Sequence, residues 1–504
     1  MNKMLITTNK VGLVALSDIP VLEYSDFFEQ VIELLKQESC HILSYFAREI
    51  NDGQLEAIIL IGDDSLSQVH IASYRCTTSK ALESIANVYS GAQAFEREIN
   101  ENFGLDFMRH PYAKPLRYSA ERVQKWQNIN NYPFYSIAGD SLHEVNVGPI
   151  HAGIIEPGVF RFICNGEKVL NLEIVLGYQH RGIERLITQS ANTLKGALLA
   201  ESIAGDSVVS HASTYAAVIE NLSDINEQQI STVRHERAIA QELERIAMHL
   251  SDTAGLSTDI AYQLGQVSCE ALRTIIINTS QAWCGNRFSK AMIRPCGSNF
   301  PLTDSIRKII TDNVKDVQHR YKQVADNLQS MPSVLSRFED CGHISRNTML
   351  ELGAVGVVAR ASGLARDIRS SHPFGAYIAN SYTPIIHEDG DVMSRLKVRL
   401  DEGDASANYI LELLDKNLEP SNLEPEYAGS LKANALAFNL NEGWRGEICH
   451  TAITDSKGNI SHYKIVDPSF HNWYALGLTL REEGISDFPI NNKSFNLSYC
   501  GHDL

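Results

Sequence analysis

The sequence predicts an α+β protein, in which a small α/β N-terminal domain is followed by a large, mainly helical domain with β hairpins. Three observations favour this class. Short β-rich runs alternate with amphipathic stretches in the first 118 residues, a hairpin pattern follows at residues 160–174, and helical periodicity dominates most of the chain beyond it. The length of 504 residues suggests about two to four domains.

The N-terminal region predicts strands around one clear helix. Its first 20 residues predict a strand rather than a signal peptide, because Lys10 interrupts the apolar part and no small-residue cleavage site is present. Val21–Leu35 has apolar residues at helical spacing, whereas Ala57–Gly62 and Val69–Tyr74 are rich in β-formers. Ile85–Phe103 returns to a mixed helical pattern.

Prolines and polar residues after position 110 predict a domain boundary. We expect a first domain at residues 1–118, a linker at 119–144 and a second domain at 145–504. In the second domain, Phe160–Ile163 and Val169–Ile174 flank a turn sequence and predict a hairpin. Further helices are expected at residues 185–220, from 237 onward, and at 266–292, 303–330, 348–370 and 390–416, with strands near 447–453 and 462–466.

Composition excludes several classes of protein. Lys and Arg number 44 against 61 Asp and Glu, and the net charge of −17 argues against binding to nucleic-acid phosphates or to anionic bilayers. No apolar run reaches the roughly 18 residues that a membrane-spanning helix needs. The nine cysteines include no CxxC pair, which is typical of reduced thiols. We expect a soluble, acidic, intracellular protein with no nucleic-acid partner.

Common active-site motifs are missing from the sequence. Neither GxGxxG nor GxxxxGKS/T occurs, so no Rossmann or P-loop nucleotide site is supported. The HExxH, CxxC and GxSxG motifs are also missing. The chemistry must therefore come from other residues or from a partner.

Two sets of motifs carry a family resemblance. The second domain contains short motifs rich in Gly, Pro, His, Arg and Glu: Gly148-Pro149-Ile150-His151, Glu156-Pro157-Gly158, residues 176–184 (LGYQHRGIE), Gly285-Asn286-Arg287, Arg294-Pro295-Cys296-Gly297 and Asp467-Pro468-Ser469-Phe470. On these motifs, residues 145–504 resemble the superfamily that joins the 49-kDa subunit of respiratory complex I to the large subunit of membrane-bound NiFe hydrogenases. The energy-converting group that includes formate hydrogenlyase looks most similar.

The first domain fits the same resemblance. Phe95-Glu96-Arg97-Glu98, with Phe103-Gly104 and His110-Pro111, resembles the signature of the 30-kDa subunit of complex I. In formate hydrogenlyase the two parts are likewise fused. The resemblance therefore implies a 30-kDa-like domain followed by a domain with the hydrogenase large-subunit fold.

The positions that the resemblance assigns to metal ligands lack thiolates. The CGxC position of the hydrogenases holds Ala204 and Ser207, and the final CxxC position holds Ser498 and Gly501. Cys500 is one residue short of the last ligand position. Soft thiolates are the ligands that such a centre needs. We therefore expect neither a NiFe centre nor another cofactor bound by this chain, and no C-terminal peptide to be removed after nickel insertion.

The pattern of the complex I quinone site is incomplete as well. The position of its quinone-site histidine, four residues after His151, holds Ile155, and its tyrosine would fall near Gly205–Asp206. A quinone could bind here only if His151 or Asp206 took over the missing contacts.

Several ionisable residues of the resemblance are retained. Glu156 matches the glutamate that carries protons from the hydrogenase centre, and Glu184 matches the glutamate of the RGxE motif beside it. Arg181 matches an arginine beside the terminal iron–sulfur cluster of a neighbouring subunit, and with His180 it is expected to face that cluster. Together with His151 and Asp206, these are the candidate catalytic residues. If Glu156, Glu184 and Asp206 line one buried cavity, they could relay protons.

Structural roles are open beside the functional ones. Glu184 and Arg181 could form a salt bridge. His151 and His211 could be core histidines, and Cys296 and Cys500 buried thiols. Ser207 and Ser498 could bond nearby backbone groups, and Glu96–Glu98 with Arg97 could form either a surface run or an interdomain or partner contact.

The resemblance implies a peripheral subunit on the cytoplasmic side of the inner membrane. Its expected partners are a 20-kDa-type iron–sulfur subunit with a 4Fe–4S cluster and antiporter-like membrane subunits. Two functions remain open. The chain could belong to an oxidoreductase that couples electron transfer to proton or ion translocation, or it could be a redox-inactive structural or coupling subunit. A true hydrogenase ranks third.

Overall fold

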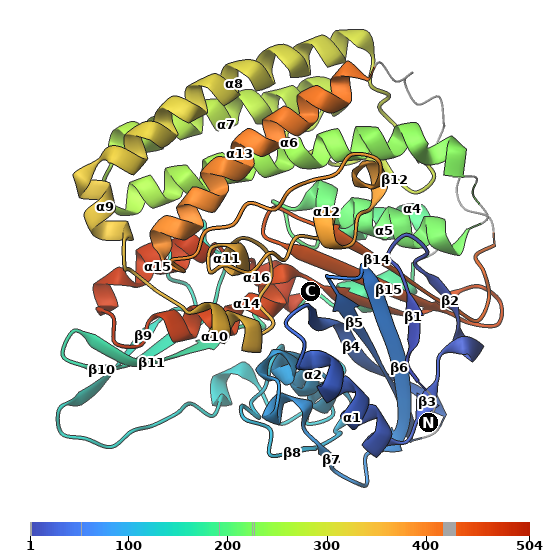
Figure 1. Cartoon of the computed structure of the whole chain (residues 1–504). Coiled ribbons are helices and arrows are strands. Elements are labelled where there is room, and N and C mark those ends of the chain that lie inside the picture. The colour runs from blue at the N-terminus through green and yellow to red at the C-terminus, as the bar shows by residue number, and fades with distance from the viewer. Residues whose placement is uncertain (1–2, 52, 191, 224, 226, 417–429) are drawn as a thin grey trace.

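The computed structural model describes residues 3–51, 53–190, 192–223, 225, 227–416 and 430–504. Residues 1–2 of the first predicted strand and residue 191 of a predicted helix lie outside these ranges. The N-terminal domain is built on a five-stranded sheet whose strands are β1 (Leu5–Thr7), β3 (Val21–Leu22), β4 (Cys40–Asn51), β5 (Gln54–Asp63) and β6 (Gln68–Thr77). Helices α1 (Tyr24–Leu35) and α2 (Gln93–Phe103) pack on this sheet (Figure 1).

The predicted elements of the N-terminal domain are present. The helix expected at 21–35 is α1, and the two expected strands lie within β5 and β6. The sequence analysis missed β4, because eight successive residues of this strand are buried and no alternation marks it. A short parallel pair, β7 (Leu82–Glu83) and β8 (Phe107–Met108), completes the domain.

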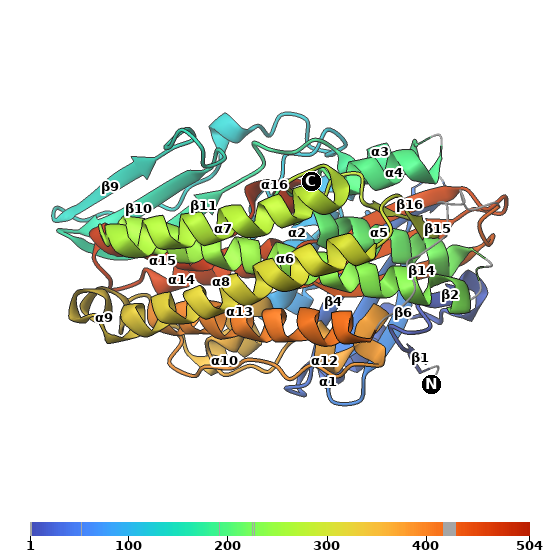
Figure 2. The ribbon, with the colours of Figure 1, turned by 90° about the horizontal axis from the view of Figure 1, so that it is seen from above.

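The predicted hairpin is confirmed. It consists of β10 (Val159–Asn165) and β11 (Lys168–Val175), and β9 (Leu142–Val147) adds a third antiparallel strand. Gly166 lies in the turn with φ of +60°, a conformation that glycine adopts without strain. This sheet extends away from the N-terminal sheet (Figures 1 and 2).

Long helices form the bulk of the second domain. They are α5 (Val208–Leu222), α6 (Glu227–Asp259), α7 (Gln263–Cys284), α8 (Asp304–Ser330) and α13 (Val392–Asp415). Helices α6, α7, α8 and α13 run side by side over one side of the molecule (Figures 1 and 2). The α+β class is therefore confirmed.

Two expected helices are broken into shorter ones. Residues 185–220 form α3 (Ile183–Thr188), α4 (Thr193–Ala200) and α5, and residues 348–370 form α10 (Arg346–Glu351), α11 (Gly356–Arg360) and α12 (Ile368–Ser371). Gly353 and Gly356 adopt positive φ and interrupt the second stretch. The backbone approaches so closely here that a Cβ on Gly356 would lie 1.9 Å from the oxygen of Arg445. The remaining elements before α13 are α9 (Pro332–Phe338) and the pair β12 (Ile293–Arg294) and β13 (Gly297–Ser298).

A second sheet joins the two ends of the chain. Its strands are β16 (Ile460–Val466), β15 (Glu447–Thr454), β14 (Ala435–Glu442) and β2 (Leu13–Ala15), in that order and all antiparallel. Helices α14 (Pro468–Thr479), α15 (Phe488–Phe495) and α16 (Tyr499–Asp503) follow. Because β2 comes from the N-terminal region, the two predicted domains share this sheet. The predicted boundaries at 118 and 145 stay predictions.

None of the helices in the described ranges combines the length and the apolar character needed to cross a bilayer.

Phe470 is expected to contribute strongly to stability at the contact between the two domains. It is 3% exposed, its ring centroid lies 5.0 Å from that of Phe95, and the guanidinium of Arg117 lies 4.7 Å from its ring. Phe470→Ala should cost about 3–5 kcal/mol, because it leaves a cavity in a shared core. The thermal unfolding midpoint would report this loss. The half-exposed Phe288→Ala is the control and should cost about 0.5 kcal/mol or less. Equal midpoints for both variants would contradict the expectation.

Candidate functional site

The segment with the LGYQHRGIE motif is held against the last helix. The main-chain oxygen of Leu504 accepts hydrogen bonds from the amides of Arg181 and Gly182, both at 2.8 Å. The Asp503 carboxylate accepts two further amide hydrogen bonds from the same segment, and its main-chain oxygen lies 2.8 Å from Nδ1 of His180. This segment therefore has little freedom to move relative to α16.

Arg181 joins the two segments that carry the four assigned ligand positions. Its exposed side chain donates to the carbonyl oxygens of Ser202 at 2.5 Å, Ile203 at 2.9 Å and Cys500 at 3.4 Å. The suggested salt bridge between Arg181 and Glu184 is not formed, because Glu184 bonds elsewhere. The tertiary structure thus brings together residues 203 and 500, next to two of the assigned ligand positions.

None of the four assigned ligand positions offers a thiolate, and two of them, Ser498 and Gly501, are engaged in other contacts. Ala204 and Gly501 carry no ligand atom, and the hydroxyl of Ser498 accepts a hydrogen bond from the amide of Gly501 at 2.9 Å. Ser207 directly precedes α5 but its side chain does not cap that helix. A Cβ at Gly501 would lie 2.6 Å from the carboxylate of Asp467, which occupies the space of a longer side chain. This donor set does not fit a nickel–iron centre, which needs thiolates.

No other metal-binding arrangement is present in the part of the chain that the structure describes. There, no group of three or more His, Cys, Asp or Glu side chains is placed to hold a metal ion.

Glu184 lines a cavity without the other two predicted carboxylates. This cavity of about 300 Å³ is lined by residues 180–185 among others, whereas Glu156 and Asp206 do not line it. Glu184 Oε1 accepts a hydrogen bond from Lys464 Nζ at 3.1 Å. The expectation of one cavity lined by all three carboxylates is therefore wrong, because each carboxylate bonds to a different partner.

Asp206 and Glu156, both partly buried, make their contacts with other parts of the chain. Asp206 forms a bidentate ion pair with Arg445, at 2.7 and 2.6 Å, and the guanidinium of Arg445 lies 3.9 Å from the ring centroid of Trp444. Glu156 Oε2 accepts a hydrogen bond from the amide of Cys500 at 3.2 Å. Burial and the charge of Glu156 raise the pKa of the Cys500 thiol to about 12, so this thiol stays protonated at neutral pH.

His151 lies beside the C-terminal segment and keeps one nitrogen without a hydrogen bond. Its ring centroid lies 5.4 Å from that of Phe160 and 6.3 Å from that of Tyr499. Burial lowers the pKa of His151, which favours its neutral form. Its Nε2 has no hydrogen-bond partner among the described residues. Ile155, four residues on, is half exposed.

Glu98 of the FERE motif lies at the domain interface, whereas Glu96 bonds within the first domain. Glu98 accepts hydrogen bonds from Lys464 Nζ at 2.7 Å to both oxygens and forms an ion pair with Arg117. Glu96 is fully buried and accepts from the amide of Ile85 at 2.7 Å. Of the two interpretations of this motif, the structure supports the interdomain contact. Lys464 therefore links the first domain, through Glu98, to the candidate site, through Glu184.

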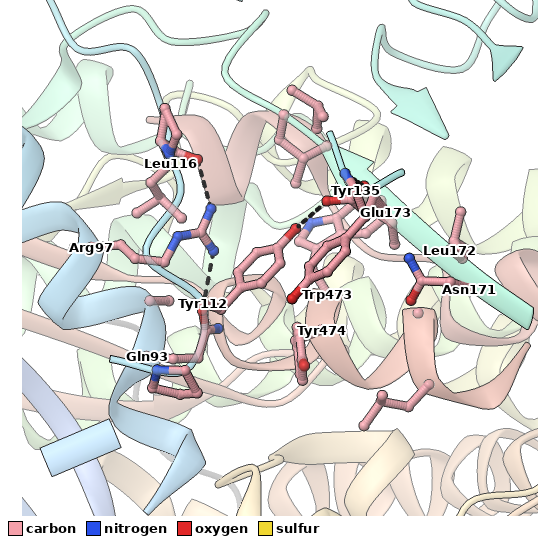
Figure 3. A pocket seen from close by; sticks show the side chains of 18 of the residues that line it. Gln93, Arg97, Tyr112, Leu116, Tyr135, Asn171, Leu172, Glu173, Trp473 and Tyr474 are labelled. Atoms are coloured by element: carbon pink, nitrogen blue, oxygen red, sulfur yellow. Dashed lines mark hydrogen bonds between the residues drawn. The ribbon is translucent and has the colours of Figure 1, made fainter. Parts of the chain in front are cut away.

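A second and larger cavity lies between α2, the linker, β11 and α14 (Figure 3). It measures about 370 Å³ and is lined by aromatic and charged side chains. Tyr112 directs its hydroxyl towards Glu173 at 3.4 Å, and Arg97 donates to the side chain of Gln93 at 3.1 Å. From the sequence, Arg97 is recognisable only as part of a motif, because no local pattern places α2 next to β11.

The sequence analysis also missed the partners of the site residues. Lys464, Arg445 and Asp467 were assigned no role. Two of them could have been noticed in the sequence. Asp467 stands in the DPSF motif, and Lys464 is the single cation of a predicted strand, which is a weak indication of a functional role. No sequence pattern indicates a role for Arg445, because its partner Asp206 is 239 residues away.

Family models match both parts of the chain. The model described as the 30 Kd subunit of the respiratory-chain NADH dehydrogenase matches residues 24–128, and the model described as the 49 Kd subunit matches residues 259–428. The predicted fusion of these two types is thereby confirmed.

Relatives come from both branches of the predicted superfamily. The chain is 28% identical to a carbon monoxide-induced hydrogenase of Rhodospirillum rubrum, over 69% of this chain and 96% of that protein. It is 26% identical to formate hydrogenlyase subunit 5 of Escherichia coli, over 81% of this chain and 74% of the relative. It is 22% identical to the C/D subunit of the NADH-quinone oxidoreductase of Phocaeicola vulgatus, over 82% of this chain and 84% of that relative.

Glu244 should make the stability of the site depend on pH. It accepts hydrogen bonds from the amide of Val209 at 2.7 Å and from the hydroxyl of Ser210 at 2.6 Å. Burial nevertheless raises its pKa from the usual 4.5 to about 7. Between these pH values the folded chain holds a proton that the unfolded chain has lost, so stability should fall as pH rises, by about 1.4 kcal/mol per pH unit.

Glu244→Gln should make this slope between pH 4.5 and 7 shallower in thermal unfolding by the contribution of one carboxyl, while Glu96 and Glu442, whose pKa values burial also raises to about 7, keep theirs. Exposed Glu339→Gln is the control and should keep the slope. A Glu244→Gln profile parallel to that of the unchanged chain would contradict the assignment.

Proposed function

The chain joins a domain of the 30-kDa subunit family of complex I to one of the 49-kDa family, and from this membership we propose that it is a peripheral subunit of a membrane-bound oxidoreductase complex. The complex is related to complex I and to energy-converting hydrogenases, and it couples electron transfer to proton or ion translocation. The chain lies on the cytoplasmic side of the inner membrane.

The observation that carries the proposal is the placement of Arg181. Its side chain is exposed, yet four carbonyl hydrogen bonds hold it at the edge of the cavity that contains Glu184. An exposed but rigid cation suits a contact with an anionic cluster and its thiolate ligands. A 20-kDa-type iron–sulfur subunit would therefore dock here and bring a 4Fe–4S cluster close to Arg181 and His180. Antiporter-like membrane subunits would complete the complex.

This chain would itself hold no NiFe centre. The support comes from the side chains at the four ligand positions and from the Asp467 carboxylate, which takes up the space at Gly501. A quinone remains a candidate acceptor on one observation, the unpartnered Nε2 of His151, which could donate to or accept from a headgroup. Asp206 is a weaker candidate for that contact, because Arg445 occupies both of its oxygens.

The second candidate function is a redox-inactive structural or coupling subunit. It is favoured by the lost thiolates and by the ion pairs of Glu184 and Asp206, which are typical of a structural role. A true hydrogenase is the third and least favoured of the candidate functions.

Purification from the native cell tests the complex directly. The tagged chain, isolated anaerobically in mild detergent, should bring with it an iron–sulfur subunit and multi-spanning antiporter-like proteins, identified by mass spectrometry. Recovery of the chain alone from the soluble fraction would refute the proposal. Metal analysis of the same sample should find iron but no nickel, whereas nickel at about one atom per chain would favour the hydrogenase.

Glu184→Gln separates the two remaining functions. In the oxidoreductase, this variant should abolish turnover or its coupling to ion movement, since it removes an ionisable group from the cavity beside Arg181. The matched control is Glu220→Gln, which also removes a buried carboxylate from an ion pair, with Arg237, but lines neither cavity that contains Glu184. A loss of stability without a specific loss of turnover, or equal losses in both variants, would favour the structural role.

A further inference from the structure

The larger cavity, shown in Figure 3, is bordered by both domains and by the linker between them. Its volume of about 370 Å³ falls within the range of roughly 300–1,000 Å³ that is typical of sites for small organic molecules. Tyr135 of the linker and Phe470, Trp473 and Tyr474 of α14 are among the residues that form its walls. The indole N–H of Trp473 already donates to the main-chain oxygen of Ser498 at 3.3 Å. The walls therefore offer flat, largely apolar surface, against which a planar ring can pack.

Arg97 brings to this cavity a positive charge that no carboxylate neutralises. Its Nε donates to the main-chain oxygen of Lys114 and one terminal nitrogen donates to that of Pro115, both at 2.7 Å. The other terminal nitrogen donates to the side chain of Gln93 at 3.1 Å. All three acceptors are neutral, and Arg97 forms no ion pair with any of the described residues. A guanidinium carries five N–H groups, so two remain for a ligand.

The guanidinium and the aromatic walls lie close enough for one small molecule to contact both. The ring centroid of Tyr112 lies 4.8 Å from the guanidinium carbon of Arg97 and 5.7 Å from the ring centroid of Tyr474. Arg97 and Tyr474 are therefore neighbours of the same ring, and all three residues line the cavity (Figure 3).

Glu173, the one carboxylate among the described residues that line the cavity, is already neutralised. It is buried, and one of its oxygens forms an ion pair with Lys114 and lies 3.4 Å from the hydroxyl of Tyr112. The other oxygen accepts a hydrogen bond from the amide of Tyr135 at 2.6 Å. Because these partners take up both oxygens, Glu173 does not offer a site for a cationic ligand.

Further hydrogen-bonding groups line the same cavity. Asn171 lies two residues from Glu173 on β11, so both side chains point to one face of the strand. Neither the side-chain amide of Asn171 nor the hydroxyl of Tyr474 has a hydrogen-bond partner among the described residues. Arg481, which is exposed, adds a second positive charge to the lining and forms no ion pair within the described ranges. In a chain with a net charge of −17, this cavity therefore presents a local surplus of positive charge.

We propose that this cavity binds a small planar aromatic molecule that carries one carboxylate. The ring packs against Tyr135 and Tyr474, and the carboxylate accepts hydrogen bonds from the two remaining N–H groups of Arg97. A cationic ligand would be repelled by Arg97 and would find no available carboxylate, whereas a neutral ligand would leave the guanidinium without a counter-charge. None of the residues assigned to the oxidoreductase site lines this cavity, so the inference does not rest on the proposed function.

Titration calorimetry on the purified chain tests the class of ligand. The probe is cinnamate; cinnamamide has the same ring without the charge, and acetate has the charge without the ring. Cinnamate should bind at one site per chain, and cinnamamide should bind roughly tenfold more weakly or worse, because it lacks the charge-assisted hydrogen bonds to Arg97. Acetate should give no saturable heat. Equal affinities for cinnamate and cinnamamide, or no saturable binding of cinnamate, would overturn the proposal.

Arg97→Gln tests the residue that receives the carboxylate. This variant should bind cinnamate roughly tenfold more weakly or worse and cinnamamide as before, since only the charged ligand needs the guanidinium. The matched control is Arg122→Gln: Arg122 also donates three hydrogen bonds to neutral oxygens, but it does not line the cavity. Equal affinities of the two variants for cinnamate would contradict the assignment of Arg97.

Asn171→Asp gives a second test that removes no hydrogen bond of the fold. The added negative charge should weaken the binding of cinnamate by roughly fivefold or more through repulsion, and should leave that of cinnamamide unchanged. The matched control is Asn165→Asp, which makes the same substitution in the same sheet at an exposed position outside the cavity. If both variants bind cinnamate as tightly as the unchanged chain, the carboxylate does not lie in this cavity and the inference is wrong.

Discussion

A network of seven buried charges holds the second domain together. It consists of the arginines Arg245, Arg360 and Arg369 and the carboxylates Glu242, Asp367, Glu402 and Glu442, none of them more than 1% exposed. The guanidinium of Arg360 forms ion pairs with both Glu442 on β14 and Glu402 on α13, each with a nitrogen–oxygen distance of 2.7 Å. Charges at this depth have no water to solvate them, so removing one partner leaves an uncompensated charge at a cost of about 3–5 kcal/mol. The relative positions of α6, α11, α13 and β14 are therefore tightly defined.

The candidate site depends on this arrangement. The network anchors β14, and β15 and β16 follow it in the same sheet. That sheet presents His450 and Tyr463 to α5, which carries His211, and it ends at Asp467 where α14 begins. A small shift of the sheet against α5 would break hydrogen bonds of about 3 Å, whose strength falls steeply with distance and angle. The buried charge network is thus a condition for these hydrogen bonds between the sheet and α5.

The site also belongs to both domains. Lys464 on β16 binds Glu98 of the first domain and Glu184 of the second, and β2 extends the same sheet from the N-terminal region. A change in the contact between the two domains would therefore alter the surroundings of Glu184 through the side chain of Lys464. Fusion of the 30-kDa and 49-kDa types in one polypeptide keeps these contacts within a single molecule.

The sequence by itself determined the α+β class, the helix α1, the hairpin of β10 and β11 and the long helices, because hydrophobic periodicity and turn residues are local properties. It also determined the family and the chemistry at positions 204, 207, 498 and 501, since residue identity alone decides whether a thiolate exists. Only the tertiary structure decided that Glu184 pairs with Lys464, that Asp206 pairs with Arg445 and that Asp467, His211 and His450 lie within hydrogen-bond distance in a row. The residues of each of these pairs lie between 239 and 280 positions apart in the sequence, and their contacts depend on packing that no local pattern encodes.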